Sequence, residues 1–346
     1  MRKPTFGQRR AVCPPCPADY FDYYSNSEWA HANFKINVWQ WYLREALMKR
    51  ASIQFNPTKL PFRTTLIRQI TKQHLTHIND VYWMHANSVE AIKGHFPNIS
   101  APRSGPGYRT ILQEQERWEK GADDFSIWVR QNTILSAASI LEVYIVSACT
   151  VVFSACPELI DRSLLGIDST SFIKHADRLP PGYRRMIKKR SEDPTKGEWS
   201  DRIRKLEMEI GRVPSRVSSL VPKLQELQNK RNRIAHSYGA EGELRRTPWE
   251  PITAIPADDA DILEIFKVVD TVSKELDKYM FGPLIGGYEI MNEYHSWLCA
   301  QDQTYTLPIK ELVSGFRKYL GKSFGQAPGS NYIQAMIEYY DNVGPP

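Results

Sequence analysis

Apolar residues recur three and four positions apart through most of the chain, and this spacing predicts amphipathic helices. Gly286-Gly287, Pro308 and the Gly/Ser-rich stretch 321–330 separate the helices of the tail. The pattern as a whole predicts an all-α protein. Its helices are expected over residues 28–51, 62–93, 108–120, 125–156, 222–239 and 262–281, with three more after residue 282.

Proline and glycine divide this helical pattern into regions. Residues 97–107, PNISAPRSGPG, form the clearest linker. Residues 159–201 are broken by Pro180-Pro181-Gly182, and we expect an insertion or loop there. The expected organisation is an irregular segment at 1–26, an N-terminal helical unit at 27–96, the linker, a central helical domain at 108–282 and a C-terminal helical extension at 283–346.

The most apolar stretch, residues 133–156, is long enough to raise the question of a membrane span. Glu142 lies inside it, Ser and Thr interrupt it, and no aromatic or basic residues flank both of its ends. We therefore expect a buried core helix and no membrane partner.

The segment richest in candidate chemistry is 222–239, PKLQELQNKRNRIAHSYG. Leu224, Leu227 and Ile234 follow helical spacing, and Arg231 occupies a position of the same stripe where an apolar residue is due. Asn232 and His236 are four residues apart, so they lie one above the other on the neighbouring face. A guanidinium, a carboxamide and an imidazole therefore gather near the end of one helix.

These groups suit the cleavage of RNA by its own 2′-hydroxyl, without a metal. His236 has the side chain that moves protons near neutral pH, and Arg231 has a fork of donors for the charge that builds on the phosphoryl oxygens. Asn232 can fix the imidazole tautomer or hold a phosphate oxygen. An ideal helix directs residues 231 and 236 about 140° apart, so a second copy of the chain is the simplest way to complete one site.

Residues 231–236, RNRIAH, resemble the Arg-polar-x3-His signature of HEPN domains (higher eukaryote and prokaryote nucleotide-binding), with Arg231, Asn232 and His236 at the matching positions. The resemblance covers residues 125–281. It implies a helical bundle that dimerises to form a composite site for metal-independent endoribonuclease activity, leaving a 2′,3′-cyclic phosphate and a 5′-hydroxyl. It also implies a growth-arresting toxin or an antiviral (antiphage) defence effector, with a possible neutralising or regulatory protein partner. No cofactor is expected.

Further candidate residues are placed around this motif. Glu142 needs a partner in its apolar surroundings. It either orients Arg231, or it faces water or the other end of the bundle. Basic and aromatic side chains near the motif and along the basic run 183–190 are expected to contact RNA. These candidate RNA-binding residues are Lys230, Arg233, Tyr238, Arg184, Arg185, Lys188 and Lys189.

Composition limits the remaining alternatives. Of the 346 residues, 42% are hydrophobic and 24% are charged, as is usual for a globular protein. The net charge of +6 is compatible with a nucleic-acid partner but does not require one. Five cysteines and the lack of an apolar leader favour a reduced, cytoplasmic protein. Cys13, Cys16, His74 and His77 do not form a standard zinc pattern, so no metal is expected. The competing functions are a non-catalytic HEPN-like binding or assembly module and a zinc-dependent nuclease.

Overall fold

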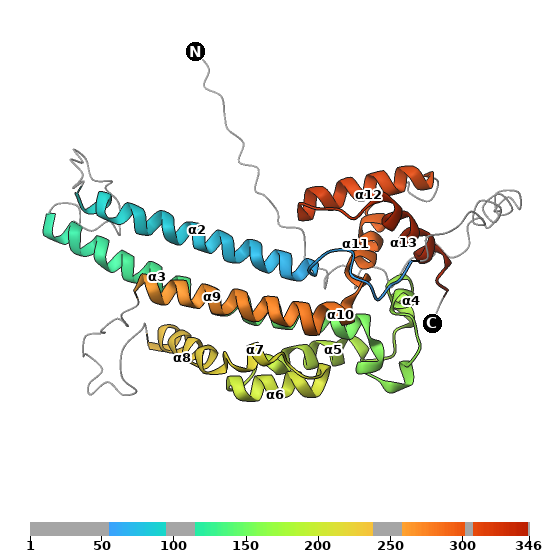
Figure 1. The fold of residues 1–346 in the computed structure, drawn as a ribbon, viewed down its shortest axis with the longest axis horizontal. Helices are drawn as coiled ribbons and strands as arrows, with labels where there is room; N and C mark the ends of the chain where they lie inside the picture. Colours follow the sequence, from blue (N-terminus) through green and yellow to red (C-terminus); the bar gives the residue numbers. More distant parts are fainter. Residues whose placement is uncertain (1–54, 95–114, 238–257, 302–306, 345–346) are drawn as a thin grey trace, which may run out of the picture. The chain divides into compact units, whose positions relative to one another are not determined.

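One long helix, α3 (Gln115–Ala155), is the element against which several other helices pack. The computed structural model describes residues 55–94, 115–237, 258–301 and 307–344, all within a unit that begins at residue 53. This described part contains helices and no strand, which confirms the all-α prediction. Figure 1 shows α2 and α9 running alongside α3. The helices in contact with α3 include α2 (Leu66–Gly94), α5 (Tyr183–Glu192), α8 (Val221–Ser237), α9 (Asp259–Leu276) and α10 (Gly282–Ile285).

The charged segment and the apolar segment that follows it form one helix. Of the expected helices at 108–120 and 125–156, the described residues form the single continuous helix α3 from residue 115. Gly121 weakens a helix interior by about 1 kcal/mol. Contacts with α2 offset this cost: Trp118 Nε1 donates to the Ile92 carbonyl at 2.7 Å, and Lys93 Nζ lies 2.6 Å from Asp123 Oδ1.

Within the described residues, α3 is one helix that by length and composition could cross a membrane, and 44% of its apolar window is buried. Its buried residues include Leu141, Tyr144, Cys149 and Phe153, which join the main hydrophobic core with residues of α5, α8 and α9. The expected core position of these residues is thus observed. The expected absence of a membrane partner stays a prediction.

The region predicted as an insertion or loop, 159–201, is mostly helical, so that prediction is wrong. The Asp168 side chain caps α4 (Ser169–Lys174) by accepting from Thr170 N at 2.8 Å, and α5 begins directly after Gly182. Tyr183, Ile187 and Ser191 are four residues apart and buried, which gives this short helix its inner face. The elements here are η4 (Pro157–Leu159), η5 (Arg162–Leu164), α4 (Ser169–Lys174), η6 (Ala176–Arg178), α5, η7 (Asp193–Thr195), α6 (Trp199–Ile210) and, before α8, α7 (Ser215–Ser218).

The last part of the chain forms its own hydrophobic cluster, which includes Tyr294, Phe316 and Met336. The predicted interruptions are confirmed: Gly286 ends α10, Pro308 precedes α12 (Ile309–Phe324) and Gly325 ends it. At Gly286 a Cβ atom would lie 2.4 Å from the Pro57 carbonyl oxygen, so only glycine permits this approach. The elements after α9 are η8 (Asp277–Phe281, a π-helical turn), α10, α11 (Tyr288–Cys299), α12 (Ile309–Phe324) and α13 (Ser330–Asn342).

Two buried carboxylates from distant elements close the N-terminus of α2. Glu289 of α11 accepts from the backbone N–H groups of Leu66 at 2.7 Å and Ile67 at 3.1 Å. Asp277 of η8 accepts from the backbone N–H and the hydroxyl of Thr65. Such bonds satisfy donors that a helix start leaves without a partner, and negative charge is favourable there. Burial nevertheless raises the pKa of Asp277, and it raises the pKa of Glu289 to about 7.

Other expectations fall outside the described residues. They concern the helix at 28–51, the cysteines Cys13 and Cys16, and the linker at 97–107. The predicted division into domains stays a prediction. His74 and His77 are exposed on α2.

The buried Glu289 carboxyl predicts a pH-dependent stability. Because its pKa rises from 4.5 to about 7, the folded state holds one more proton than the unfolded chain between these values. The free energy of unfolding should therefore fall as pH rises from 5 to 7.5, by at most roughly 3 kcal/mol. Glu289→Gln keeps an acceptor oxygen but cannot ionise, so urea unfolding of this variant should show a flatter profile. Exposed Glu311→Gln is the matched control, and equal slopes for wild type and Glu289→Gln would contradict the prediction.

Candidate functional site

The α8 helix places Arg231 on its inward face. Leu224, Leu227 and Ile234 are buried in the core cluster at the predicted spacing. Arg231 lies on the same stripe, with its side chain 35% exposed. The predicted stripe is therefore confirmed, and its cation lies at the edge of the core rather than inside it.

The Glu142 carboxylate on α3 lies between two arginines. Arg202 of α6 donates from Nη1 to Glu142 Oε1 at 2.9 Å, whereas Arg231 Nη2 lies 4.0 Å from Glu142 Oε2. Arg202 is 8% exposed, and it also donates from Nε to the Gly197 carbonyl at 2.8 Å. The expected approach of Glu142 to Arg231 is observed at the outer limit of an ion pair. The tighter partner of Glu142 is Arg202.

Asn232 holds the Arg231 guanidinium. Its side-chain oxygen accepts from Arg231 Nη1 at 3.1 Å, so this carboxamide orients the arginine. His236 lies in the last turn of α8, where the structure describes its backbone but not its side chain. Tyr238 lies outside the described residues.

The other candidate RNA contacts differ in how accessible they are. Lys230 is 14% exposed and lies 2.9 Å from Asp261 and 3.0 Å from Glu226, so its charge is already engaged within the protein. Arg233 is exposed. On α5, the cations Arg184, Arg185, Lys188 and Lys189 are exposed together.

The basic run on α5 lies away from the motif on α8. The Tyr183 hydroxyl donates to the Phe153 carbonyl near the C-terminal end of α3, whereas Arg231 lies by Glu142. Eleven residues of α3 separate these two positions, which is about 16 Å along a helix axis. The structure therefore does not bring the basic run and Arg231 to one place on α3.

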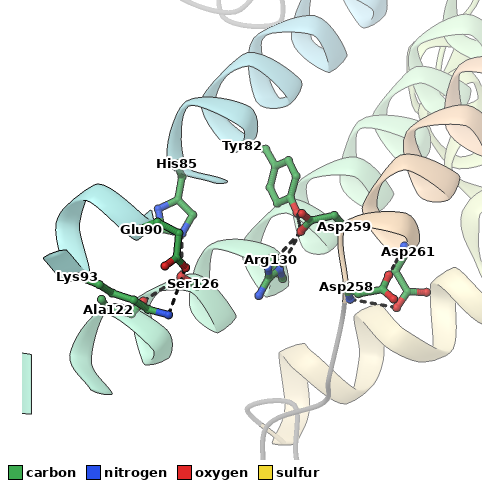
Figure 2. A network of polar contacts seen from close by, with 10 residues as sticks. All are labelled: Tyr82, His85, Glu90, Lys93, Ala122, Ser126, Arg130, Asp258, Asp259 and Asp261. Atoms are coloured by element: carbon green, nitrogen blue, oxygen red, sulfur yellow. Dashed lines mark hydrogen bonds and ion pairs between the residues drawn. The ribbon is translucent and has the colours of Figure 1, made fainter. Parts of the chain in front are cut away.

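A polar network joins α2, α3 and the start of α9 (Figure 2). The Tyr82 hydroxyl and Arg130 Nη2 both donate to Asp259 Oδ1, the second donor at 3.1 Å. Burial, with the bond to Asp259, raises the pKa of Tyr82 to about 12, and the Tyr82 bond holds the pKa of Asp259 below its ordinary value. Asp258 and Asp261 form a reciprocal cap at the start of α9. Since Asp261 also binds Lys230, this network fixes α9 against α8.

Sequence reasoning missed Arg202 as a partner of Glu142. The signal was present, because Trp199, Ile203 and Leu206 form the buried stripe of α6 and Arg202 lies on the same face. The same pattern, a cation where an apolar residue is due, had singled out Arg231. The network at Asp259 joins residues far apart in the chain, and no local spacing indicates it.

Comparisons with protein-family models, with curated proteins and with solved structures found no match. The resemblance to HEPN domains therefore rests on Arg231, Asn232 and His236 and on their position at the end of α8.

The geometry around Glu142 predicts unequal couplings to its two arginines. A double-mutant cycle with Glu142→Gln and Arg202→Met should give a coupling of about 2 kcal/mol, because this charge-assisted bond is short and shielded from water. The cycle with Arg231→Met should give at most about 0.5 kcal/mol, because that pair is long and partly solvated. Both are measured by urea unfolding. Equal couplings would contradict the assignment of Arg202 as the main partner.

Proposed function

We propose that the chain is a metal-independent endoribonuclease of the HEPN type, which acts as a homodimer and cuts RNA through the 2′-hydroxyl. The observation that carries the proposal is the position of Arg231, half-exposed on α8 and held by Asn232, five residues before His236 in the same helix. A partly exposed, oriented guanidinium and an imidazole near the end of the same helix are the groups that this chemistry needs.

Each residue takes a defined part in the proposed reaction. His236 removes the proton of the 2′-hydroxyl or protonates the leaving 5′-oxygen, which a group titrating near neutral pH does efficiently. Arg231 donates to the non-bridging oxygens of the phosphorane, and Asn232 Oδ1 fixes the plane of its guanidinium. Glu142 is a positioning residue, because its negative charge at 4.0 Å draws the guanidinium toward α3. The products are a 2′,3′-cyclic phosphate and a 5′-hydroxyl.

A two-fold dimer completes the proposed site. Five residues correspond to about 500° of helical rotation, so Arg231 and His236 of one α8 diverge by about 140° and do not face one phosphate together. A symmetric interface lays the ends of two α8 helices against each other and supplies the missing group from the partner. In the proposed setting, a cytoplasmic toxin or antiviral defence effector, a neutralising protein partner would cover this surface.

The proposal predicts RNA cleavage that persists in EDTA. Purified full-length protein should cut total RNA, and His236→Ala and Arg231→Ala should each lower the rate by at least about 100-fold. His77→Ala, an exposed histidine on α2, is the matched control and should cut normally. Cleavage that requires a metal would support a zinc-dependent nuclease. RNA that is bound but stays intact would support the competing function, a non-catalytic binding or assembly module.

The dimeric arrangement has a test of its own. Equal mixing of His236→Ala and Arg231→Ala chains should restore about a quarter of wild-type activity, because half of the dimers are mixed and each has one intact pair of groups. Each variant alone stays inactive. A mixture that remains inactive after subunit exchange would contradict a site shared between two protomers.

A further inference from the structure

A cavity of about 520 Å³ opens between α12 and α13, well away in sequence from the motif on α8. Val313 and Ala327 contribute apolar surface to its lining. Its polar lining consists of three cations, two hydroxyl groups and one carboxamide, from Lys310, Arg317, Lys318, Ser314, Ser330 and Gln334. The volume lies within the range of about 300 to 1,000 Å³ that is usual for ligand sites.

The positive charge of this cavity comes from one face of α12. Residues 310, 314, 317 and 318 follow the three-and-four spacing that brings side chains together on a helix. Across from them, Ser330 and Gln334 lie one turn apart on α13. Two helices thus build a groove with cations on one wall and neutral donors on the other.

The cations of this groove are not neutralised by the described residues. Lys310 and Lys318 make no ion pair or hydrogen bond there, and the polar contact of Arg317 is a bond from Nη1 to Ser330 Oγ at 3.3 Å. Glu338, a carboxylate close to the lining, accepts from Gln334 Nε2 at 2.9 Å. Lys230 on α8, in contrast, has two carboxylate partners. The groove therefore carries three positive charges that no carboxylate of the described residues neutralises.

The chemistry of the lining points to phosphate groups. A guanidinium presents a planar fork that matches phosphate oxygens, while two ammonium groups and two hydroxyls add donors around it. Aromatic side chains, on which bases stack, do not line the groove. A ligand held here is therefore recognised by its backbone charge and not by its bases.

We propose that this groove between α12 and α13 binds the phosphate backbone of single-stranded RNA, as a docking site separate from the proposed cleavage site. The inference rests on the proposed function in taking RNA as the substrate. Docking through backbone charge adds affinity without sequence preference, and its strength falls as salt rises.

Binding to an uncleavable strand tests the groove apart from cleavage. A fluorescent 2′-O-methyl oligoribonucleotide lacks the attacking hydroxyl, so its affinity for the full chain is measured whether or not the protein is a nuclease. The variant Lys310→Ala/Arg317→Ala/Lys318→Ala should bind at least tenfold more weakly, and the slope of log K against log salt should fall by about 2, the value for three phosphates on a single strand.

The matched control removes the same charge elsewhere. Lys59, Lys72 and Lys322 are exposed and lie outside the groove. Replacing all three by Ala should therefore change the affinity and the salt slope less than the groove variant does. Arg317→Lys with Lys310→Arg and Lys318→Arg preserves the charge and should keep binding. An unfolding midpoint in urea equal to that of the wild type excludes a folding defect in the Ala variant.

Two results would overturn the inference. One is a groove variant that binds the strand no more weakly than the control variant. The other is binding of inorganic tripolyphosphate that depends on the groove while RNA affinity does not, which would assign the site to free phosphate compounds. Neither result bears on the proposed nuclease activity, because cleavage in EDTA and its loss in His236→Ala test that activity separately.

Discussion

The helical arrangement depends on two carboxylates that are buried at the start of α2. Asp277 and Glu289 come from elements more than 200 residues away, yet they accept the N–H groups that begin this helix. Leaving such donors without partners in the interior costs about 1 to 3 kcal/mol each, so the helix start and the region 277–289 must come together. The cost of burying the acids appears as their raised pKa values. The start of α2 is thereby tied to the C-terminal helices.

This anchor extends by contacts to the motif on α8. With its start fixed, α2 lies along α3 and carries Tyr82 to Asp259, where Arg130 of α3 also binds (Figure 2). Asp259 begins α9, and Asp261 in the same turn binds Lys230. Lys230 precedes Arg231, so the buried acids at the start of α2 and the part-buried network at Tyr82, in the middle of α2, both bear on the residues of the motif.

Sequence pattern predicted the helices whose faces are strongly divided into apolar and polar sides. The predicted 222–239 and 262–281 correspond to Val221–Ser237 and to Asp259–Leu276 with its π-helical extension. Pattern failed over 159–201, because the helices within this range span at most about three turns and few residues repeat to give a period. At the site, spacing located Arg231 and Glu142. It did not reveal Arg202 as the closer partner, since the distance between α3 and α6 is a property of packing.

The two arginines beside Glu142 differ in what they are free to do. Arg202 is nearly buried, bonds to Glu142 and to the Gly197 carbonyl, and lies 5.0 Å from the Trp199 ring centre, so moving it would break several contacts at once. Among the described residues, Arg231 has one hydrogen bond, to its neighbour Asn232, and a carboxylate at 4.0 Å. Because Arg202 already satisfies one oxygen of Glu142, the negative charge left to restrain Arg231 is reduced. A guanidinium held this loosely, yet kept in orientation, is the one of the pair that can turn toward a phosphate.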